Sequence, residues 1–271
     1  GSNTVSISLW VYGDGGGNNG VTRNIISKGY SIQNTNPTSI QLFKQNNGKI
    51  TFIYYSDIED YMAAHIENGI LNSDDWNHII ISANGFQSSN QTFLININGS
   101  NVPFEGEDTG IFSGINSNVE PLFIGSRVYA DGTGFMGWND KIDDLSIWNI
   151  LLSDTEKDLL LNGTKPSQLA IESGNSELDD NLILYFDFND GAGELLTDLS
   201  GNDNNGTING ATWSNDVPNL GNAGEVLSGT SYTPSTDLTD DTEYHWQVTA
   251  EDQSGATYTT PLQSFVVNAV N

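Results

Sequence analysis

Apolar and polar residues alternate along much of this chain, in short stretches separated by turns rich in glycine and asparagine. A period of two residues is typical of β-strands that bury one face. Asn46-Asn47-Gly48 and Asn98-Gly99 have the composition of hairpin turns. The pattern predicts strands at residues 4–12, 24–28, 39–43, 49–55, 61–67, 79–83, 92–97, 121–126, 142–149, 182–188 and 207–214.

The rhythm changes once, at residues 153–163. Ser153 can cap the N-terminus of a helix, and Glu156 follows three residues later, where it completes a capping box. Gly163 is placed to end that helix. Residues 102–117 have the composition of a loop, and residues 164–180 that of a polar link. The predicted fold class is therefore all-β: a two-sheet antiparallel β-sandwich of the jelly-roll type with one short helix, plus a small C-terminal β module.

Composition narrows the possible partners. Of the 271 residues 36% are hydrophobic, and 35 acidic against 8 basic residues give a net charge of −27. Such a surface repels the phosphates of nucleic acids and of anionic lipids, so neither is an expected partner. The chain has no cysteine and no apolar run of the roughly 18 residues that a membrane span needs. We expect a secreted or surface-anchored protein.

The stretches that carry a family resemblance lie in order along the chain. They are ISLWV, NGKI, DDWNHIIIS, FLININGS, LFIGS, FMGWNDKIDDLSIWNILLSDTE and LILYFDFNDGAGELLTDLSGNDNNGT. Together they resemble the laminin-G-like, concanavalin A-type jelly roll of bacterial surface proteins, over residues 3–217. The resemblance implies an extracellular bacterial recognition module that belongs to a larger multidomain protein.

Residues 219–271 differ in character from the stretch before them. The sequence SYTPSTDLTDDTEYHWQVTAEDQSGATYTTPLQSF resembles the second half of a fibronectin type III domain. About 50 residues are few for an independent core. We expect this module to pack on the sandwich, to pair with another copy, or to belong to a tandem array.

Calcium is the expected cofactor. It needs six to eight oxygen ligands, and the glycine-bent loop at 198–206 supplies many of them. From the resemblance we predict a structural ion near the paired acids of the IDD strand, the FDF strand and this loop. The alternative is that the acidic and amide side chains of the loop only stabilise Asx-turns. The predicted ligands are Asp144, Asp187, Asp198, Asn202 and Asn205.

Two aromatic stretches suggest sugar binding, because aromatic rings stack on the apolar faces of sugars while polar groups take the hydroxyls. One stretch is YYSDIEDY at 54–61, and the other is YADGTGFMGWN at 129–139. The alternative is that these rings fill the core. The predicted ligand-binding residues are Tyr54, Tyr61, Tyr129, Phe135 and Trp138.

Catalysis is not expected, and no catalytic residue is predicted. Sandwiches of this type include glycoside hydrolases, which need two carboxylates about 5–9 Å apart. The nearest candidate, Asp57-Ile58-Glu59-Asp60, has the wrong spacing. The leading hypothesis is a non-catalytic module that binds a glycan or another cell-surface ligand. A structural spacer or adhesin segment without a small-ligand site is the alternative, and a glycan hydrolase is the third hypothesis.

Overall fold

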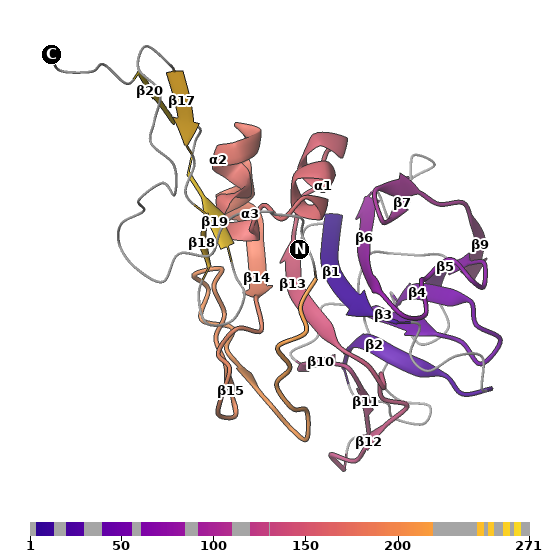
Figure 1. Ribbon diagram of the computed structural model, residues 1–271. Helices are drawn as coiled ribbons and strands as arrows, with labels where there is room; N and C mark the ends of the chain where they lie inside the picture. The colour runs from indigo at the N-terminus through magenta and orange to yellow at the C-terminus, as the bar shows by residue number, and fades with distance from the viewer. Residues whose placement is uncertain are drawn as a thin grey trace, which may run out of the picture.

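Two antiparallel sheets of six strands each form the body of the protein in the computed structural model (Figure 1). The first sheet has the order β14 (Leu182–Phe186), β13 (Ile142–Trp148), β1 (Thr4–Tyr12), β6 (Trp76–Asn84), β7 (Thr92–Ile97) and β8 (Ser100–Asn101). The second has the order β10 (Leu122–Ile124), β2 (Arg23–Lys28), β3 (Ile40–Lys44), β4 (Ile50–Tyr55), β5 (Tyr61–Ile66) and β9 (Phe104–Thr109). The predicted two-sheet antiparallel sandwich is confirmed.

The structure describes part of the chain. The described residues are 4–13, 20–29, 40–55, 61–84, 92–109, 120–129, 131–218, 243–246, 249–251, 257–260 and 263–266. The candidate carboxylates at 57–60 lie wholly outside them.

The main core lies between the two sheets. Each strand contributes every second side chain, because successive residues point to opposite faces. Leu9 of β1 and Ile79 of β6 are fully buried partners in the first sheet, and Leu42 of β3 and Phe52 of β4 are fully buried partners in the second. The alternation read from the sequence is therefore the alternation that builds this core.

A second apolar cluster lies on the outer face of the first sheet, where Figure 1 shows the helices next to β13 and β14. These are α1 (Asp154–Leu161), the 3-10 turn η1 (Pro166–Gln168), α2 (Leu169–Ser173) and α3 (Glu177–Asn181). Their apolar residues pack on Trp148, which is fully buried. Strands β1 and β6 are consequently buried on both faces rather than on one.

The predicted capped helix is confirmed as α1. The Ser153 side chain accepts a hydrogen bond from the Glu156 amide, and the Ser153 amide donates to the Glu156 carboxylate at 2.6 Å. The sequence predicted one helix only, and that number is too small, because the segment expected to be a polar link also forms η1, α2 and α3. α2 and α3 have five residues each, too few for a helical period to show in the sequence.

Two other stretches differ from the prediction. Residues 104–109, expected to be a loop, form the edge strand β9, which pairs with β5. Its sequence FEGEDT lacks the apolar alternation of a central strand, and charged residues are typical of an exposed edge. Of the strand expected at 207–214, only the short β16 (Gly206–Thr207) forms, paired with β15 (Leu195–Leu196).

The C-terminal residues form two short strand pairs. β17 (Glu243–Trp246) pairs with β20 (Gln263–Val266), and β18 (Thr249–Glu251) pairs with β19 (Thr257–Thr259). The described part of the predicted small C-terminal β module therefore consists of antiparallel strand pairs. The likeness to a fibronectin type III domain and the domain boundaries stay predictions.

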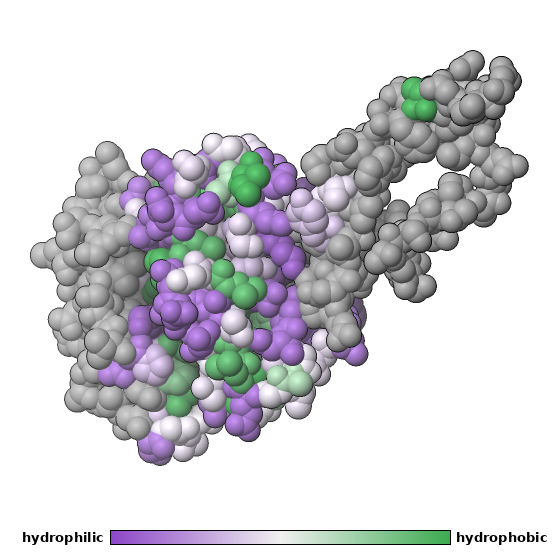
Figure 2. All heavy atoms as spheres, turned by 90° about the vertical axis from the view of Figure 1, so that its left-hand side faces the viewer, coloured by the Kyte–Doolittle hydropathy of each residue, from purple (hydrophilic) through white to green (hydrophobic). Residues whose placement is uncertain are grey.

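The surface around α2, β14 and β15 is mixed in character. Figure 2 shows apolar groups in green as separate areas among purple hydrophilic ones. Exposed apolar residues of these and neighbouring segments are Ile171, Ile183, Leu195 and Leu199. Among the described residues no helix has the length and apolar character to span a membrane.

Candidate functional site

The outer face of the second sheet carries the candidate site. Pairing places Ser27 of β2 beside Gln41 of β3, and Gln41 beside Ile53 of β4. Because the neighbouring Leu42 and Phe52 point into the core, these three residues point to the opposite face. Tyr55, two residues after Ile53, therefore lies on the outer face as well.

Two tyrosines close one end of this face. Tyr55 at the end of β4 pairs with Tyr61 at the start of β5, and their ring centroids are 5.5 Å apart. Tyr54 points the other way and is only 1% exposed. Of the two tyrosines predicted here as ligand contacts, Tyr61 is half-buried beside Tyr55, whereas Tyr54 packs in the core and is unavailable to a ligand.

A small hairpin, β11 (Arg127–Val128) and β12 (Gly134–Phe135), presents the second aromatic group. Tyr129 and Phe135 stack face to face, with ring centroids 3.9 Å apart and an angle of 12° between the ring planes. The backbone amide of Tyr129 donates to the Thr133 carbonyl at 2.9 Å, which holds the hairpin closed. Tyr129 is 40% exposed, so one side of the stacked pair faces solvent.

Trp138, the fifth predicted contact, belongs to the main core and is 8% exposed. Its amide donates to the Gly125 carbonyl at 2.8 Å, which ties the end of the hairpin segment to the residue after β10. Trp138 thus anchors the hairpin to the core, in agreement with the alternative that this ring fills the core.

Arg127 links the two aromatic groups. Its guanidinium carbon lies 5.9 Å from the centre of the Phe135 ring, and its charge interacts with the phenols of Tyr55 and Tyr129. Burial lowers the pKa of Arg127, while these two phenols oppose that shift. Sequence reasoning missed Arg127. The available signal was its rarity, because the chain has only two arginines, Arg23 and Arg127.

Polar side chains are buried in β2 and β3 on the same sheet. Asn24 and Ser27 have no exposed surface, and Gln41 donates a hydrogen bond to the Asn24 carbonyl oxygen. The Asn24 amide nitrogen and the Ser27 hydroxyl have no hydrogen-bond partner among the described residues. Buried polar atoms normally find partners, so this face retains unused hydrogen-bonding capacity.

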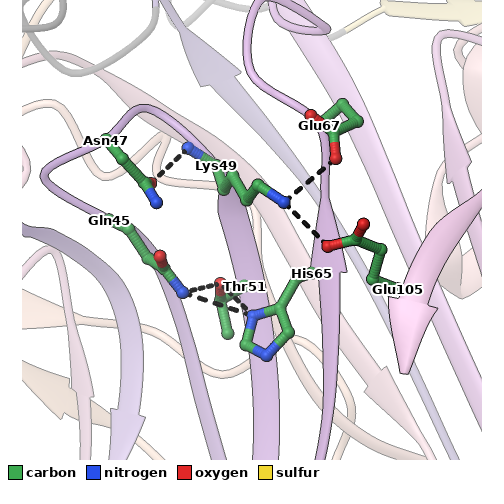
Figure 3. Close-up of polar contacts among 7 residues, drawn as sticks. All are labelled: Gln45, Asn47, Lys49, Thr51, His65, Glu67 and Glu105. Atoms are coloured by element: carbon green, nitrogen blue, oxygen red, sulfur yellow. Dashed lines mark hydrogen bonds and ion pairs between the residues drawn. The ribbon is translucent and has the colours of Figure 1, made fainter. Parts of the chain in front are cut away.

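The opposite end of this sheet is occupied by a polar network (Figure 3). The Thr51 hydroxyl contacts His65 Nδ1 at 3.0 Å, and Gln45 donates to Thr51 at 2.8 Å. Lys49 forms ion pairs with Glu67 at 3.0 Å and with Glu105 at 2.8 Å. The side chains at this end are engaged with one another.

The loop at 198–205 caps the free edge of β14. The Asp198 carboxylate accepts hydrogen bonds from the amides of Tyr185, Ser200 and Asn204 and from the Ser200 hydroxyl, at 2.9–3.0 Å. The Asn202 side chain donates to the Leu182 carbonyl at 2.8 Å. These contacts satisfy backbone groups of an edge strand that would otherwise stay unpaired.

The predicted calcium ligands therefore divide into two groups. Asn205 accepts a hydrogen bond from the Asp198 amide at 2.9 Å, so the oxygens of both residues are used within the loop. As built, the loop fits the Asx-turn alternative better than a set of six to eight free oxygens. Among the described residues, no group of three or more histidine, aspartate or glutamate side chains is placed to hold a metal.

Asp144 and Asp187 form the other group, beside Asp143. Asp144 sits at a bulge in β13 with φ of 45°, where the pairing with β1 shifts between Ser8 and Trp10. The Tyr185 hydroxyl donates to the Asp144 carboxylate at 3.1 Å. Burial raises the pKa of Asp143 and of Asp144, and the charge of Asp187 raises both further. Calcium stays a prediction, with Asp144 and Asp187 as the two ligands that lie together.

Comparison with known proteins identifies the family. The family described as the concanavalin A-like lectin/glucanases superfamily matches residues 1–156, so the chain belongs to this superfamily. No curated protein sequence matches the chain.

Solved structures resemble the fold at low identity. The binding domain of botulinum neurotoxin serotype D/C is 17% identical with a TM-score of 0.44, over 60% of this chain and 37% of that one. The chain thus spans little more than a third of that domain. The CBM40 domain of a Ruminococcus gnavus IT-sialidase was solved with α2,3-sialyllactose. It is 12% identical to this chain with a TM-score of 0.38, and the match covers 56% of this chain and 79% of that one.

Proposed function

We propose that this chain is a non-catalytic extracellular module that binds glycans at the surface formed by Tyr55, Tyr61, Arg127, Tyr129 and Phe135. We call these five residues the aromatic surface. The observation that carries the proposal is the stacked pair of Tyr129 and Phe135, in which Tyr129 is 40% exposed and the Arg127 guanidinium lies 5.9 Å from the centre of the Phe135 ring. A flat ring open to solvent offers a stacking platform for the apolar face of a sugar.

The chemistry of this surface favours binding over hydrolysis. Glycoside hydrolases place two carboxylates on either side of the scissile bond. The described part of the aromatic surface presents rings, phenol hydroxyls and one guanidinium instead. Membership of a superfamily that contains lectins and glucanases is compatible with both binding and hydrolysis. The proposal therefore rests on the local residues rather than on the fold.

Location and partners follow from composition. A net charge of −27 and the absence of cysteine fit a secreted or surface-displayed bacterial module within a larger multidomain protein. A spacer without a ligand of its own is the competing role.

A glycan array tests the proposal directly. The wild-type chain should bind a defined set of glycans. Tyr129→Ala should weaken that binding about tenfold or more, since stacking of the sugar depends on the Tyr129 ring. Tyr258→Ala is the matched control, because Tyr258 is a tyrosine of the C-terminal hairpin that is 49% exposed. Absence of any bound glycan at high protein concentration would favour the spacer, and release of reducing sugar from a bound glycan would favour the hydrolase.

A further inference from the structure

Three of the eight basic side chains of this acidic chain form ion pairs with described carboxylates. Figure 3 shows Lys49 between Glu67 and Glu105. Lys141 lies 2.9 Å from Asp216, and Lys157 lies 3.0 Å from Asp154. With 35 acidic side chains for 8 basic ones, a nearby carboxylate is the ordinary environment of a cation here.

Arg127 forms no such ion pair among the described residues, and like that of Arg23 its Nε atom is buried without a partner there. Among the described residues nothing accepts a hydrogen bond from the Arg127 guanidinium. Its neighbours are the face of the Phe135 ring and the phenols of Tyr55 and Tyr129, none of which carries a negative charge at neutral pH. The other arginine, Arg23, donates to the Gly137 carbonyl.

Among the described residues, no counter-charge lies beside this half-buried guanidinium. Burial of an unpaired charge lowers the stability of the folded chain, because the charge loses part of its hydration. An anion that docks on it recovers that loss. The guanidinium presents its N–H donors as a planar fork, which matches the paired oxygens of a carboxylate or the oxygens of a sulfate.

We propose that Arg127 selects glycans that carry an anionic group, a carboxylate or a sulfate, next to the sugar ring that stacks on Tyr129. This inference rests on the proposed glycan-binding function and specifies its ligand class. In this proposal the sugar ring lies on the Tyr129–Phe135 pair and the anionic group meets the guanidinium.

The charge of the whole chain limits the ligand further. A net charge of −27 repels a long polyanion, whereas a single anionic group interacts mainly with charges within about 8 Å at physiological salt. The preferred ligand is thus a short or terminal acidic sugar on an otherwise neutral glycan.

Calorimetric titration with matched sugars tests the inference. The probes are lactose, 3′-sialyllactose as the carboxylate arm and 3′-sulfated lactose as the sulfate arm, extended by the best acidic glycan of the array and its neutral parent. The wild-type chain should bind an acidic member about tenfold or more tightly than its neutral parent, as charge-assisted hydrogen bonds add to stacking. Arg127→Gln should remove this preference, because it should weaken binding of the acidic member about tenfold more than binding of its neutral parent.

Lys49→Gln is the matched control, because it removes one positive charge from the same sheet at a site already paired with carboxylates. It should leave the preference intact. If Arg127→Gln does not fold, Arg127→Lys replaces it, and the loss of the planar fork should still reduce the preference several-fold.

The outcomes separate the two proposals. Equal binding of acidic and neutral members, with loss of both in Tyr129→Ala, overturns the role of Arg127 and leaves the glycan-binding function standing. A preference that survives in Arg127→Gln also overturns it. Failure of every array glycan and every probe to bind overturns the glycan-binding function itself.

Discussion

The outer faces of the two sheets serve different ends. On the first sheet, α1 to α3 cover the strands and create a second apolar cluster that includes the fully buried Trp148. On the second sheet, the outer face bears the Lys49 network at one end and the aromatic surface at the other. Helices thus cover one outer face of the sandwich, whereas the other carries the surface for which we propose a ligand.

The difference follows from the chain's connectivity. The helical segment follows β13 directly and returns into β14, so it is held over the sheet that contains both strands. The hairpin of β11 and β12 follows β10, an edge strand of the other sheet, and brings its rings to that sheet's outer face. The outer faces of the two sheets therefore differ because different segments connect or follow their strands.

The largest expected effect separates the two faces by stability. Trp148→Ala should lower the free energy of unfolding by about 3–5 kcal/mol, because a fully buried indole leaves a cavity between the sheet and the helices. Tyr129→Ala should cost less than about 1 kcal/mol, as expected for an exposed side chain. Urea denaturation followed by tryptophan fluorescence and circular dichroism measures both. Equal losses would mean that the aromatic surface is structural.

The next largest effect on stability is expected from loss of the hydrogen bonds that cap the edge of β14. Asp198→Ala removes the acceptor of four hydrogen bonds and should destabilise the chain by about 2–4 kcal/mol. Asp203→Asn, at an exposed position with φ of 57° that asparagine tolerates, is the control. Thermal unfolding compares the variants, and an unchanged melting temperature for Asp198→Ala would remove the capping role.

Acid should weaken the helix-covered face selectively. His78 lies in that layer, 2.8 Å from the Ser8 hydroxyl and stacked on Trp10, and burial lowers its pKa from 6.5 to about 3. The unfolded chain therefore binds a proton that the folded chain refuses, so stability is present above about pH 6.5 and falls as the pH drops toward 3. The loss from pH 7 to pH 5 should be roughly 2 kcal/mol.

His78→Gln tests this assignment. The variant should unfold with a weaker dependence on pH between 7 and 5 than the wild type, although it is less stable throughout because the stacking on Trp10 is lost. His65→Gln, on the outer face of the second sheet, controls for the loss of a histidine elsewhere. An identical pH profile for wild type and His78→Gln would contradict the prediction.

The smallest expected effect concerns calcium. Millimolar calcium should raise stability by about 1 kcal/mol over the EDTA-treated chain if an ion binds with the affinity of extracellular modules. Asp144→Asn combined with Asp187→Asn should abolish the increase, while Asn202→Ala should preserve it. Differential scanning calorimetry provides the readout. If neither calcium nor EDTA changes the melting temperature, the prediction of a calcium site at the bulge in β13 is wrong.

Sequence alone determined the sandwich, most of its strands and the capped helix, because these depend on local periodicity and on residues three positions apart. It also singled out Tyr129 and Phe135, which the structure stacks on each other, and their role in ligand binding stays a prediction. It could not separate Tyr54 from its outward-facing neighbour Tyr55, since a shift of one residue exchanges the two faces of a strand. Nor could it find the short helices or the edge strand β9, whose apolar residues are too few to show a period.

Tertiary structure alone decided which residues meet. Arg127 and Tyr55 are more than seventy positions apart in the printed sequence, and only the folded chain brings the Arg127 guanidinium near the Tyr55 phenol. The same is true of the loop at 198–205, where the Asp198 carboxylate accepts a hydrogen bond from the Tyr185 amide of β14 and the Asn202 side-chain amide donates one to the Leu182 carbonyl. Residue type limits what a side chain can bind, but its actual partner depends on long-range packing that no local pattern records.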